Sequence, residues 1–271
     1  MKLYTNGVMY KVNIHQNRAD LPYLFFLHGF MGSSKVFEPV ISRVRETCNP
    51  VTIDLLGHGD TIISDEVNPD RFAAQNQVAD LLSVLNRLKL PDLFIYGYSM
   101  GGRLAQHLVA NHPSYFSGLI LESTHCGITD SNERENRAAT DENRAQEIEE
   151  DFESFVDEWI RLPLFDSQND ESEINYEQII RQQNPKWMAA SLRGFGAGVM
   201  SPVCKTLADL NHPKLLIAGK IDQKYVDKMT QMAQLCSNAT VEIIEDAGHR
   251  VHADRPEQIA KILTQFLNSH V

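Results

Sequence analysis

Short apolar runs alternate with amphipathic helical patterns along most of this chain. Six runs have the length and composition of buried strands: 23–27 (YLFFL), 51–53 (VTI), 93–96 (LFIY), 118–121 (GLIL), 214–218 (KLLIA) and 241–244 (VEII). One helical pattern starts at Pro256 and another at Arg71, and the latter gathers four apolar side chains on one face: Val78, Leu81, Leu82 and Leu85. Parallel strands need long crossover connections, usually helices, so this alternation predicts a doubly wound, mostly parallel α/β sheet.

About ninety residues between the fourth and fifth of these runs lack strand character, which is far longer than an ordinary crossover. The segment has an amphipathic pattern of its own at Ile148, Phe152, Phe155 and Trp159. We therefore expect an α/β core formed by residues 1–126 and 205–271, with a helical cap, residues 127–204, inserted into it.

The negative charge of the chain is concentrated in this insertion. The formal net charge is −11, and residues 130–177 contain 17 acidic and 4 basic residues, which leaves 19 acidic and 21 basic residues elsewhere. A solvated helical face explains such an acidic segment better than a cation site. Without a stripe of Lys and Arg to displace phosphate counterions, we expect no nucleic-acid partner.

Four cysteines, at positions 48, 126, 204 and 236, are scattered without a C-x-x-C spacing. Neither a zinc site nor a disulfide framework is expected from them, and a reducing cytoplasm is the simplest setting. The first sixteen residues lack an apolar signal-peptide core, and no run reaches the roughly 18 apolar residues of a membrane helix. The sequence predicts a soluble cytoplasmic protein with no membrane insertion, metal or cofactor.

Ser99 lies between two glycines, in GYSMG, where a strand pattern meets a helix pattern. A serine at such a sharp strand-to-helix turn is typical of a nucleophile elbow. Glycines allow the close approach of the backbone there, and the N-terminus of the following helix favours negative charge beside the serine. We expect Ser99 to be the catalytic serine.

A serine hydroxyl reacts well only when an imidazole takes its proton and a carboxylate orients that imidazole. Asp222 follows the run at 214–218 and His249 follows the run at 241–244, in the order Ser, Asp, His. Glu122 and Asp246 are competing carboxylates. The other candidate histidines are expected to be ordinary surface or cap residues: His107, His112 and His252.

An oxyanion hole needs two backbone N–H donors, one from the residue after the nucleophile and one from the loop after an early strand. Met100 supplies the first, and Phe30 in FFLHGFMGSS is expected to supply the second. A hydrogen bond that fixes this loop is a better interpretation of His28 than a chemical role.

The motifs HGF, DLLGHGD, GYSMGG and GHRVH, together with Asp222, resemble the α/β-hydrolase superfamily over nearly the whole chain. A narrower set resembles the 2-succinyl-6-hydroxy-2,4-cyclohexadiene-1-carboxylate synthases, a family of menaquinone biosynthesis: GYSMGGR, LESTHCG, ERENRAATD, DEWIRLPLF, IIRQQN, SLRGFGAG and GKIDQKY. The resemblance implies an α/β-hydrolase fold and a lyase that eliminates pyruvate, with Ser99 as base, His249 accepting its proton and Asp222 holding the imidazole ring.

The resemblance also implies which residues bind a small-molecule substrate with three carboxylates: Tyr98, Arg103, Arg137, Trp159 and Arg181. Arginines suit this task because they grip carboxylates bidentately. Two plainer interpretations stay open, a surface ion pair for Arg137 and cap packing for Trp159. A carboxylesterase for an acidic ester and a ligand-binding relative without activity are the alternative functions.

Three departures from the family pattern stand out, at Leu56, at Arg250 and in the stretch VMSPVCKTL. Arg250 adds a cation beside His249, which could lower the pKa of the imidazole or contact a carboxylate. A geometric expectation concerns the cap: one unbroken helix would hold Arg137 and Trp159 about 33 Å apart. If both line one site, the chain must bend between them, near the acidic run 147–151 (EIEED).

Overall fold

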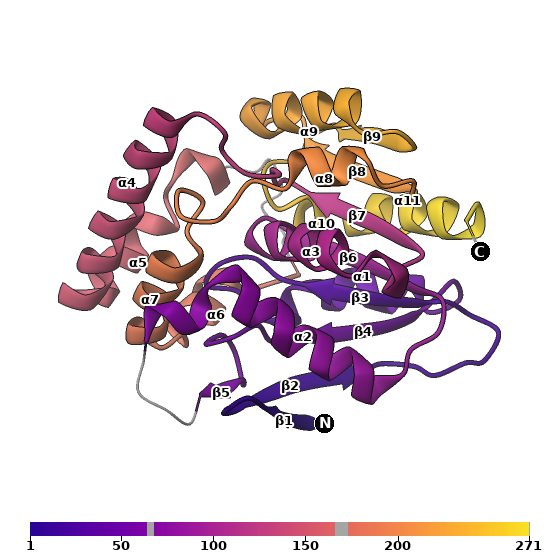
Figure 1. Cartoon of the computed structure of the whole chain (residues 1–271), viewed down its shortest axis with the longest axis horizontal. Coiled ribbons are helices and arrows are strands. Elements are labelled where there is room, and N and C mark those ends of the chain that lie inside the picture. Colours follow the sequence, from indigo (N-terminus) through magenta and orange to yellow (C-terminus); the bar gives the residue numbers. More distant parts are fainter. Residues whose placement is uncertain (64–67, 166–172, 271) are drawn as a thin grey trace.

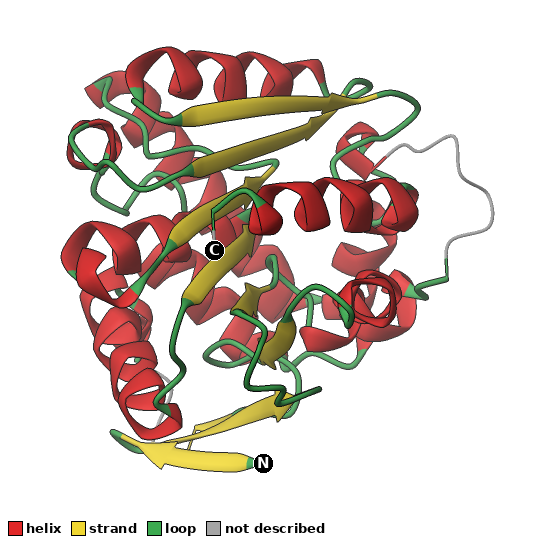
Figure 2. Cartoon of the chain, turned by 90° about the vertical axis from the view of Figure 1, so that its right-hand side faces the viewer, coloured by secondary structure: helices red, strands yellow, loops and turns green. Residues whose placement is uncertain are grey.

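The computed structural model describes residues 1–63, 68–165 and 173–270 of the 271-residue chain. Part of the expected cap, residues 166–172, lies outside the described residues. In the described part, strands form one mixed sheet with helices on both sides of it (Figures 1 and 2). None of the helices in this part is long and apolar enough to cross a membrane.

The sheet has the order β1-β2-β4-β3-β6-β7-β8-β9 among the described strands, and β5 pairs with β2. From β4 to β9 all neighbours are parallel, whereas β2 pairs antiparallel with β1, β4 and β5. The strands are β1 (Lys2–Thr5), β2 (Val8–Ile14), β3 (Tyr23–Leu27), β4 (Asn49–Ile53), β5 (Ile62–Ile63), β6 (Leu93–Tyr98), β7 (Gly118–Glu122), β8 (Lys214–Gly219) and β9 (Ala239–Ile244). All six strands expected from apolar runs are present, which confirms the mostly parallel α/β sheet.

The antiparallel strands at the N-terminal end were not anticipated. Asn6 and Gly7 have φ angles of 47° and 79°, as a two-residue turn between β1 and β2 requires. Strand β2 alternates buried Val8, Tyr10 and Val12 with less buried residues. This Asn-Gly turn between alternating residues was the available sequence signal.

Alternate residues of the central strands point to opposite faces, and each face has its own hydrophobic core. Phe25 and Leu27 of β3 pack in the core that includes residues of α2 (Ala74–Leu88), α3 (Met100–Asn111) and α9 (Gln223–Leu235). Leu24 and Phe26 pack in the core that includes residues of α1 (Glu38–Val44) and α11 (Pro256–Asn268). Both expected core helices are found, although the regular part of the first starts at Ala74 and not at Arg71.

The insertion between β7 and β8 is helical, and its first helices lie beside the carboxyl ends of the sheet strands (Figure 1). It contains α4 (Ser131–Glu150), α5 (Phe152–Trp159), α6 (Tyr176–Arg181), α7 (Pro185–Phe195) and α8 (Cys204–Ala208). Asp151 separates α4 from α5 with an extended backbone, and its carboxylate accepts a hydrogen bond from the Ser154 N–H. The bend expected near residues 147–151 is therefore present. The boundaries at 126/127 and 204/205 stay a prediction.

Cys126 and Cys204 form a disulfide, so the expectation that the cysteines are unpaired was wrong. Their Cα atoms are 4.8 Å apart although 78 positions separate them in the sequence. The chain leaves the sheet after β7 and returns to it at the neighbouring strand β8, and this return brings the two cysteines together. Sequence spacing does not reveal such a pairing. Cys48 and Cys236 are free and buried.

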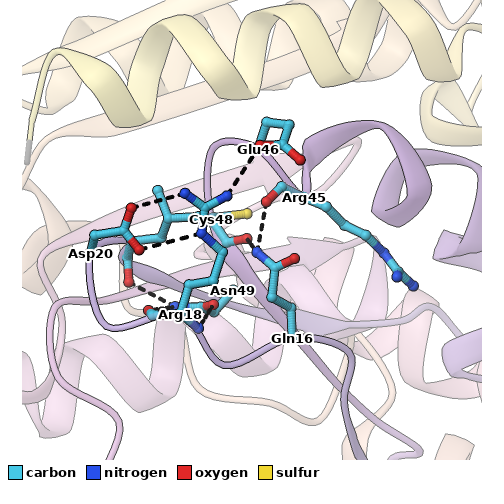
Figure 3. A network of polar contacts seen from close by, with 8 residues as sticks. Gln16, Arg18, Asp20, Arg45, Glu46, Cys48 and Asn49 are labelled. Atoms are coloured by element: carbon cyan, nitrogen blue, oxygen red, sulfur yellow. Dashed lines mark hydrogen bonds and ion pairs between the residues drawn. The ribbon is translucent and has the colours of Figure 1, made fainter.

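A polar network ties down the loop between β2 and β3 (Figure 3). Asn49, the first residue of β4, donates hydrogen bonds to the carbonyl oxygens of Arg18 and Leu21. Arg18 in turn is paired with Asp20 and Glu46. These contacts lie where β3 and β4 begin, at the edge of the sheet opposite the carboxyl ends.

Candidate active site

Ser99 occupies the sharp turn between β6 and α3. Its backbone has φ 51° and ψ −112°, a strained conformation for a residue other than glycine, and strain of this kind is typical of functional sites. The turn is crowded, because a Cβ atom on Gly101 would lie 2.3 Å from the Leu27 carbonyl oxygen. Gly101 therefore lets α3 start directly against the end of β3, with Ser99 at the helix N-terminus.

His249 connects Ser99 to Asp222. The Oγ atom of Ser99 lies 3.1 Å from Nε2 of His249, and Nδ1 of His249 lies 2.6 Å from Oδ2 of Asp222. Asp222 follows β8 and His249 follows β9, so the parallel strands place both at the same edge of the sheet as Ser99, which follows β6. The rings of Tyr98 and Tyr225 pack against the imidazole. The three polar groups have the contacts of a Ser-His-Asp triad.

Glu122 and Asp246 do not contact this imidazole. Glu122 is fully buried and accepts hydrogen bonds from the backbone N–H and the Nδ1 atom of His252. Tyr96 and Tyr176 complete this second network. His252 is thus a core residue. His107 is buried as well, so the expectation of surface or cap positions was wrong for both, because helical spacing cannot show how closely neighbouring elements pack.

A cavity opens above Ser99 between the core and the inserted helices. Five basic side chains line it, and no Asp or Glu of the described chain does. The basic residues are Arg103, Arg137, Arg144, Lys224 and Arg250. In a chain with a net charge of −11, this lining favours a polyanionic ligand.

Arg103 is 8% exposed, and its Nη1 donates hydrogen bonds to the Phe195 carbonyl oxygen and to Sδ of Met200. Burial, helped by the nearby charge of Arg137, lowers the pKa of Arg103 to about 10, so the guanidinium remains charged at neutral pH. Arg137 donates from Nε to Asp141. It therefore forms an ion pair and also lines the cavity, where its two terminal nitrogens make no described hydrogen bond.

Arg181 is the one expected substrate-binding residue that the structure does not bring to the cavity. Its guanidinium is paired with three carboxylates of neighbouring helices: Glu153, Asp157 and Glu177. These carboxylates raise the pKa of Arg181, and their negative charges offset the positive charge of its guanidinium. Among the described residues that line the cavity, Arg181 is absent.

Tyr98 and Trp159 both line the cavity. Trp159 stacks on Phe155 and packs against Phe30 and Phe165, so it belongs to the packing of the cap as well. Tyr98 is buried beside the imidazole of His249. Trp159 is therefore both a cavity-lining residue and a part of the cap packing, so the two interpretations do not exclude each other.

Arg250 lies between two aromatic rings of the inserted segment. Its guanidinium carbon is 3.8 Å from the ring centre of Phe165 and 3.9 Å from that of Tyr176. Stacking of this kind holds the cation by cation–π attraction and links the loop after β9 to the cap.

Phe30 and Met100 line the cavity next to Ser99. Met100 is the first residue of α3, so its N–H is among the helix donors without an intrahelical partner. His28 has the structural role expected of it. Its ring accepts a hydrogen bond from the Leu55 N–H and donates one to the Gly29 carbonyl oxygen, which fixes the loop that carries Phe30.

Sequence reasoning missed seven polar residues of the cavity: Thr124, His125, Arg144, Tyr176, Ser191, Lys224 and Tyr225. Arg144 offered a signal, because it follows Arg137 by seven residues and so lies on the same helix face. Lys224 and Tyr225 come two and three residues after Asp222, at the start of α9, but no local pattern distinguishes them from surface residues.

The sheet, the strained serine turn and the Ser99–His249–Asp222 contacts define a protein of the α/β-hydrolase class. The family model for the alpha/beta hydrolase fold matches residues 22–256. A putative 2-succinyl-6-hydroxy-2,4-cyclohexadiene-1-carboxylate synthase of Bacillus subtilis is 35% identical over 90% of this chain and 89% of its own length. The synthase of Enterobacter sp. is 29% identical over 94% of this chain and 95% of its own length.

A solved structure described as MenH from S. aureus has a TM-score of 0.87 at 31% identity, and it covers 96% of this chain and 98% of its own. The chain belongs to the α/β-hydrolase-fold proteins and, among them, to the 2-succinyl-6-hydroxy-2,4-cyclohexadiene-1-carboxylate synthase family.

Proposed function

We propose that this protein is the lyase that forms 2-succinyl-6-hydroxy-2,4-cyclohexadiene-1-carboxylate in menaquinone biosynthesis. Its substrate is 2-succinyl-5-enolpyruvyl-6-hydroxy-3-cyclohexene-1-carboxylate, and its second product is pyruvate. Membership of the synthase family supports the reaction. The cytoplasmic location stays a prediction.

The basic lining of the cavity is the observation that carries this proposal. The substrate bears three carboxylates, and the cavity is lined by five cations and by no described Asp or Glu, although Asp141 pairs with Arg137 behind the lining. A cavity for a neutral ester has no need of such a lining, because uncompensated charges are costly to bury. Arg103 and Arg137, with unpaired guanidinium donors directed by α3 and α4, are the primary carboxylate ligands in this proposal.

The reaction is a 1,4-elimination across the single ring alkene of the substrate, and it forms the ring diene of the product. The C–H bond beside the succinyl ketone breaks, and its electron pair forms a double bond toward the existing alkene. The alkene electrons shift one position and the bond to the enolpyruvyl oxygen breaks. Enolpyruvate leaves and takes up a proton to become pyruvate, so no water is consumed.

Ser99, His249 and Asp222 perform the proton transfer in this proposal. Ser99 Oγ takes the proton from carbon while His249 Nε2, 3.1 Å away, accepts the hydroxyl proton. Asp222 orients the ring through Nδ1 and stabilises the imidazolium. The backbone N–H groups of Phe30 and Met100 stabilise the negative charge that develops on the ketone oxygen.

We extend the proposal to the division of the chain, with the core as residues 1–126 and 205–271 and the cap as residues 127–204. Core and cap contribute different parts of the cavity. The core supplies Ser99 and His249, and the cap supplies Arg137 and Trp159.

A carboxylesterase is the second candidate, and the distances within the triad favour it as much as the lyase. The two reactions differ in what they require of the cavity. An esterase needs a water path to an acyl-enzyme, whereas the lyase needs only a base and fixed cations.

Parallel assays of wild type and Ser99→Ala decide between the two. Pyruvate release from the enolpyruvyl substrate is coupled to lactate dehydrogenase, and hydrolysis of 4-nitrophenyl acetate is followed in separate samples. We expect fast pyruvate release from wild type, a loss of at least about a thousandfold in Ser99→Ala, and slow ester hydrolysis. Fast ester hydrolysis without pyruvate release would establish the esterase.

A further inference from the structure

Arg144 lies two turns after Arg137 on α4, and both side chains line the cavity. Residues seven apart share one face of an α-helix, so α4 presents two guanidinium groups to the same space. Asp141 lies between them on this face and is only 2% exposed.

Asp141, the carboxylate that is paired with both arginines, is already engaged. Oδ1 of Asp141 accepts a hydrogen bond of 2.9 Å from Arg137, and Oδ2 accepts one from the Ala197 N–H. Arg144 approaches Oδ1 no closer than 3.7 Å, beyond hydrogen-bonding distance. No described residue accepts a hydrogen bond from the Arg144 guanidinium.

Trp159 holds Arg144 in place despite this lack of partners. The guanidinium carbon lies 5.4 Å from the Trp159 ring centre, and the side chain of Arg144 is 29% exposed. Stacking on the indole leaves the N–H groups at the edge of the guanidinium plane free to bind an anion bidentately. Burial, together with the charge of Arg137, lowers the pKa of Arg144, as for a cation that lacks a full counter-charge.

Arg181 is the opposite case in the same cap. Three carboxylates occupy its donors, and it does not line the described part of the cavity. An anion that binds Arg181 would have to displace existing ion pairs. An anion that binds Arg144 would instead accept hydrogen bonds from N–H groups that have no described acceptor.

We propose that Arg144 is a substrate-binding residue that grips one carboxylate of the substrate, and that Arg144, not Arg181, completes a set of three arginines with Arg103 and Arg137. The inference rests on the proposed lyase function, since it needs a substrate with three carboxylates. Trp159 acts here as a positioning residue, because it aligns the guanidinium plane of Arg144 with the cavity.

The test compares Arg144→Gln, Arg144→Lys and Arg181→Gln in pyruvate release, with kcat and KM measured separately. Arg193→Gln is the matched control, because Arg193 is a cap arginine held by Glu142 and Glu149 outside the cavity. We expect Arg144→Gln to raise KM about ten- to a hundredfold with a smaller change in kcat. Arg144→Lys should recover part of the loss, since it restores the charge without the bidentate geometry.

A second readout separates binding from folding. Hydrolysis of neutral 4-nitrophenyl acetate should be the same in Arg144→Gln as in wild type, and so should the thermal midpoint within a few degrees. A fall in ester hydrolysis parallel to the loss of pyruvate release would mean a damaged cap and would overturn the inference.

Two further outcomes distinguish this inference from the proposed function. If wild type releases pyruvate and Arg144→Gln keeps the wild-type KM, or if Arg181→Gln raises KM more than Arg144→Gln does, the role of Arg144 is wrong while the lyase function stands. If wild type releases no pyruvate, the lyase function itself is wrong.

Discussion

Glu122 is the last residue of β7 and Asp222 follows the adjacent strand β8, yet only Asp222 contacts the imidazole of His249. Glu122 is instead hydrogen-bonded to His252, which lies three residues after His249. The structure thus contains two buried carboxylate–imidazole pairs, and only the pair at Asp222 includes Ser99.

Asp222→Asn should therefore lower kcat for pyruvate release by roughly two to four orders of magnitude, because the amide favours the wrong imidazole tautomer. Glu122→Gln is the matched control. It should reduce stability, through its buried hydrogen bonds, and change kcat by less than about tenfold. Steady-state kinetics of both purified variants check this, and a larger kcat effect in Glu122→Gln would show that Glu122 is the functional acid.

Arg103→Gln should lower kcat/KM for pyruvate release by about ten- to a hundredfold, because a buried charged hydrogen bond to a carboxylate contributes roughly 1.5 to 3 kcal/mol. The loss should be confined to the polyanionic substrate. Hydrolysis of 4-nitrophenyl acetate by the same preparation is the control, since a neutral ester offers nothing for Arg103 to bind. Equal losses in both assays would mean that Arg103 supports the serine turn and not the substrate.

The core of the fold could be predicted because its strands are buried on both faces. Residues 23–27 and 93–96 are continuous apolar runs, and every residue of β3 and β6 is buried. The positions proposed for the triad followed from the same pattern, since Asp222 and His249 come four and five residues after predicted strands. Strand β2 was missed because one of its sides is partly exposed, which weakens an apolar signal.

The cap could be predicted only as a helical insertion with one bend. Arg144 and Arg181 both lie on helices rich in charged residues. Helical periodicity does not show which of the two pairs with carboxylates and which lines the cavity. That depends on how α4, α5 and α6 pack together: Glu153 and Asp157 of α5 reach Arg181, whereas the one described ion pair of Arg144 is the 3.7 Å contact with Asp141. Tertiary packing also formed the Cys126–Cys204 disulfide.

Removal of this disulfide should destabilise the protein. Closing a loop between positions 78 apart restricts the unfolded chain, and a disulfide of this kind contributes about 2–4 kcal/mol. Urea unfolding of wild type with and without a reductant should show that difference in the free energy of unfolding. The double variant Cys126→Ser/Cys204→Ser should resemble reduced wild type and be insensitive to reductant. A reductant effect that persists in the double variant would contradict the assignment.

Acidification should destabilise the fold through its buried histidines. Burial is the main cause that lowers the pKa of His58 to about 3, of His107 to about 4 and of His125 to about 2. In the unfolded chain a histidine titrates near 6.5, so at lower pH the unfolded state binds protons that the folded state does not. The stability contributed by neutral burial is complete above about pH 6.5 and is lost progressively as the pH falls toward the folded pKa values.

At pH 5.5 the loss should be roughly 1 to 1.5 kcal/mol for each such histidine. Urea unfolding at pH 7.5 and pH 5.5 measures it, and His58→Gln should reduce the difference between the two pH values by about the contribution of one histidine. His270→Gln, at the exposed end of the chain after α11, is the control and should leave the difference unchanged. His58 is well suited to this comparison, because its Nε2 is buried without a hydrogen-bond partner in the described structure, so a proton there would find no acceptor. A His58→Gln variant with the full wild-type pH dependence would mean that His58 takes up its proton in the folded state.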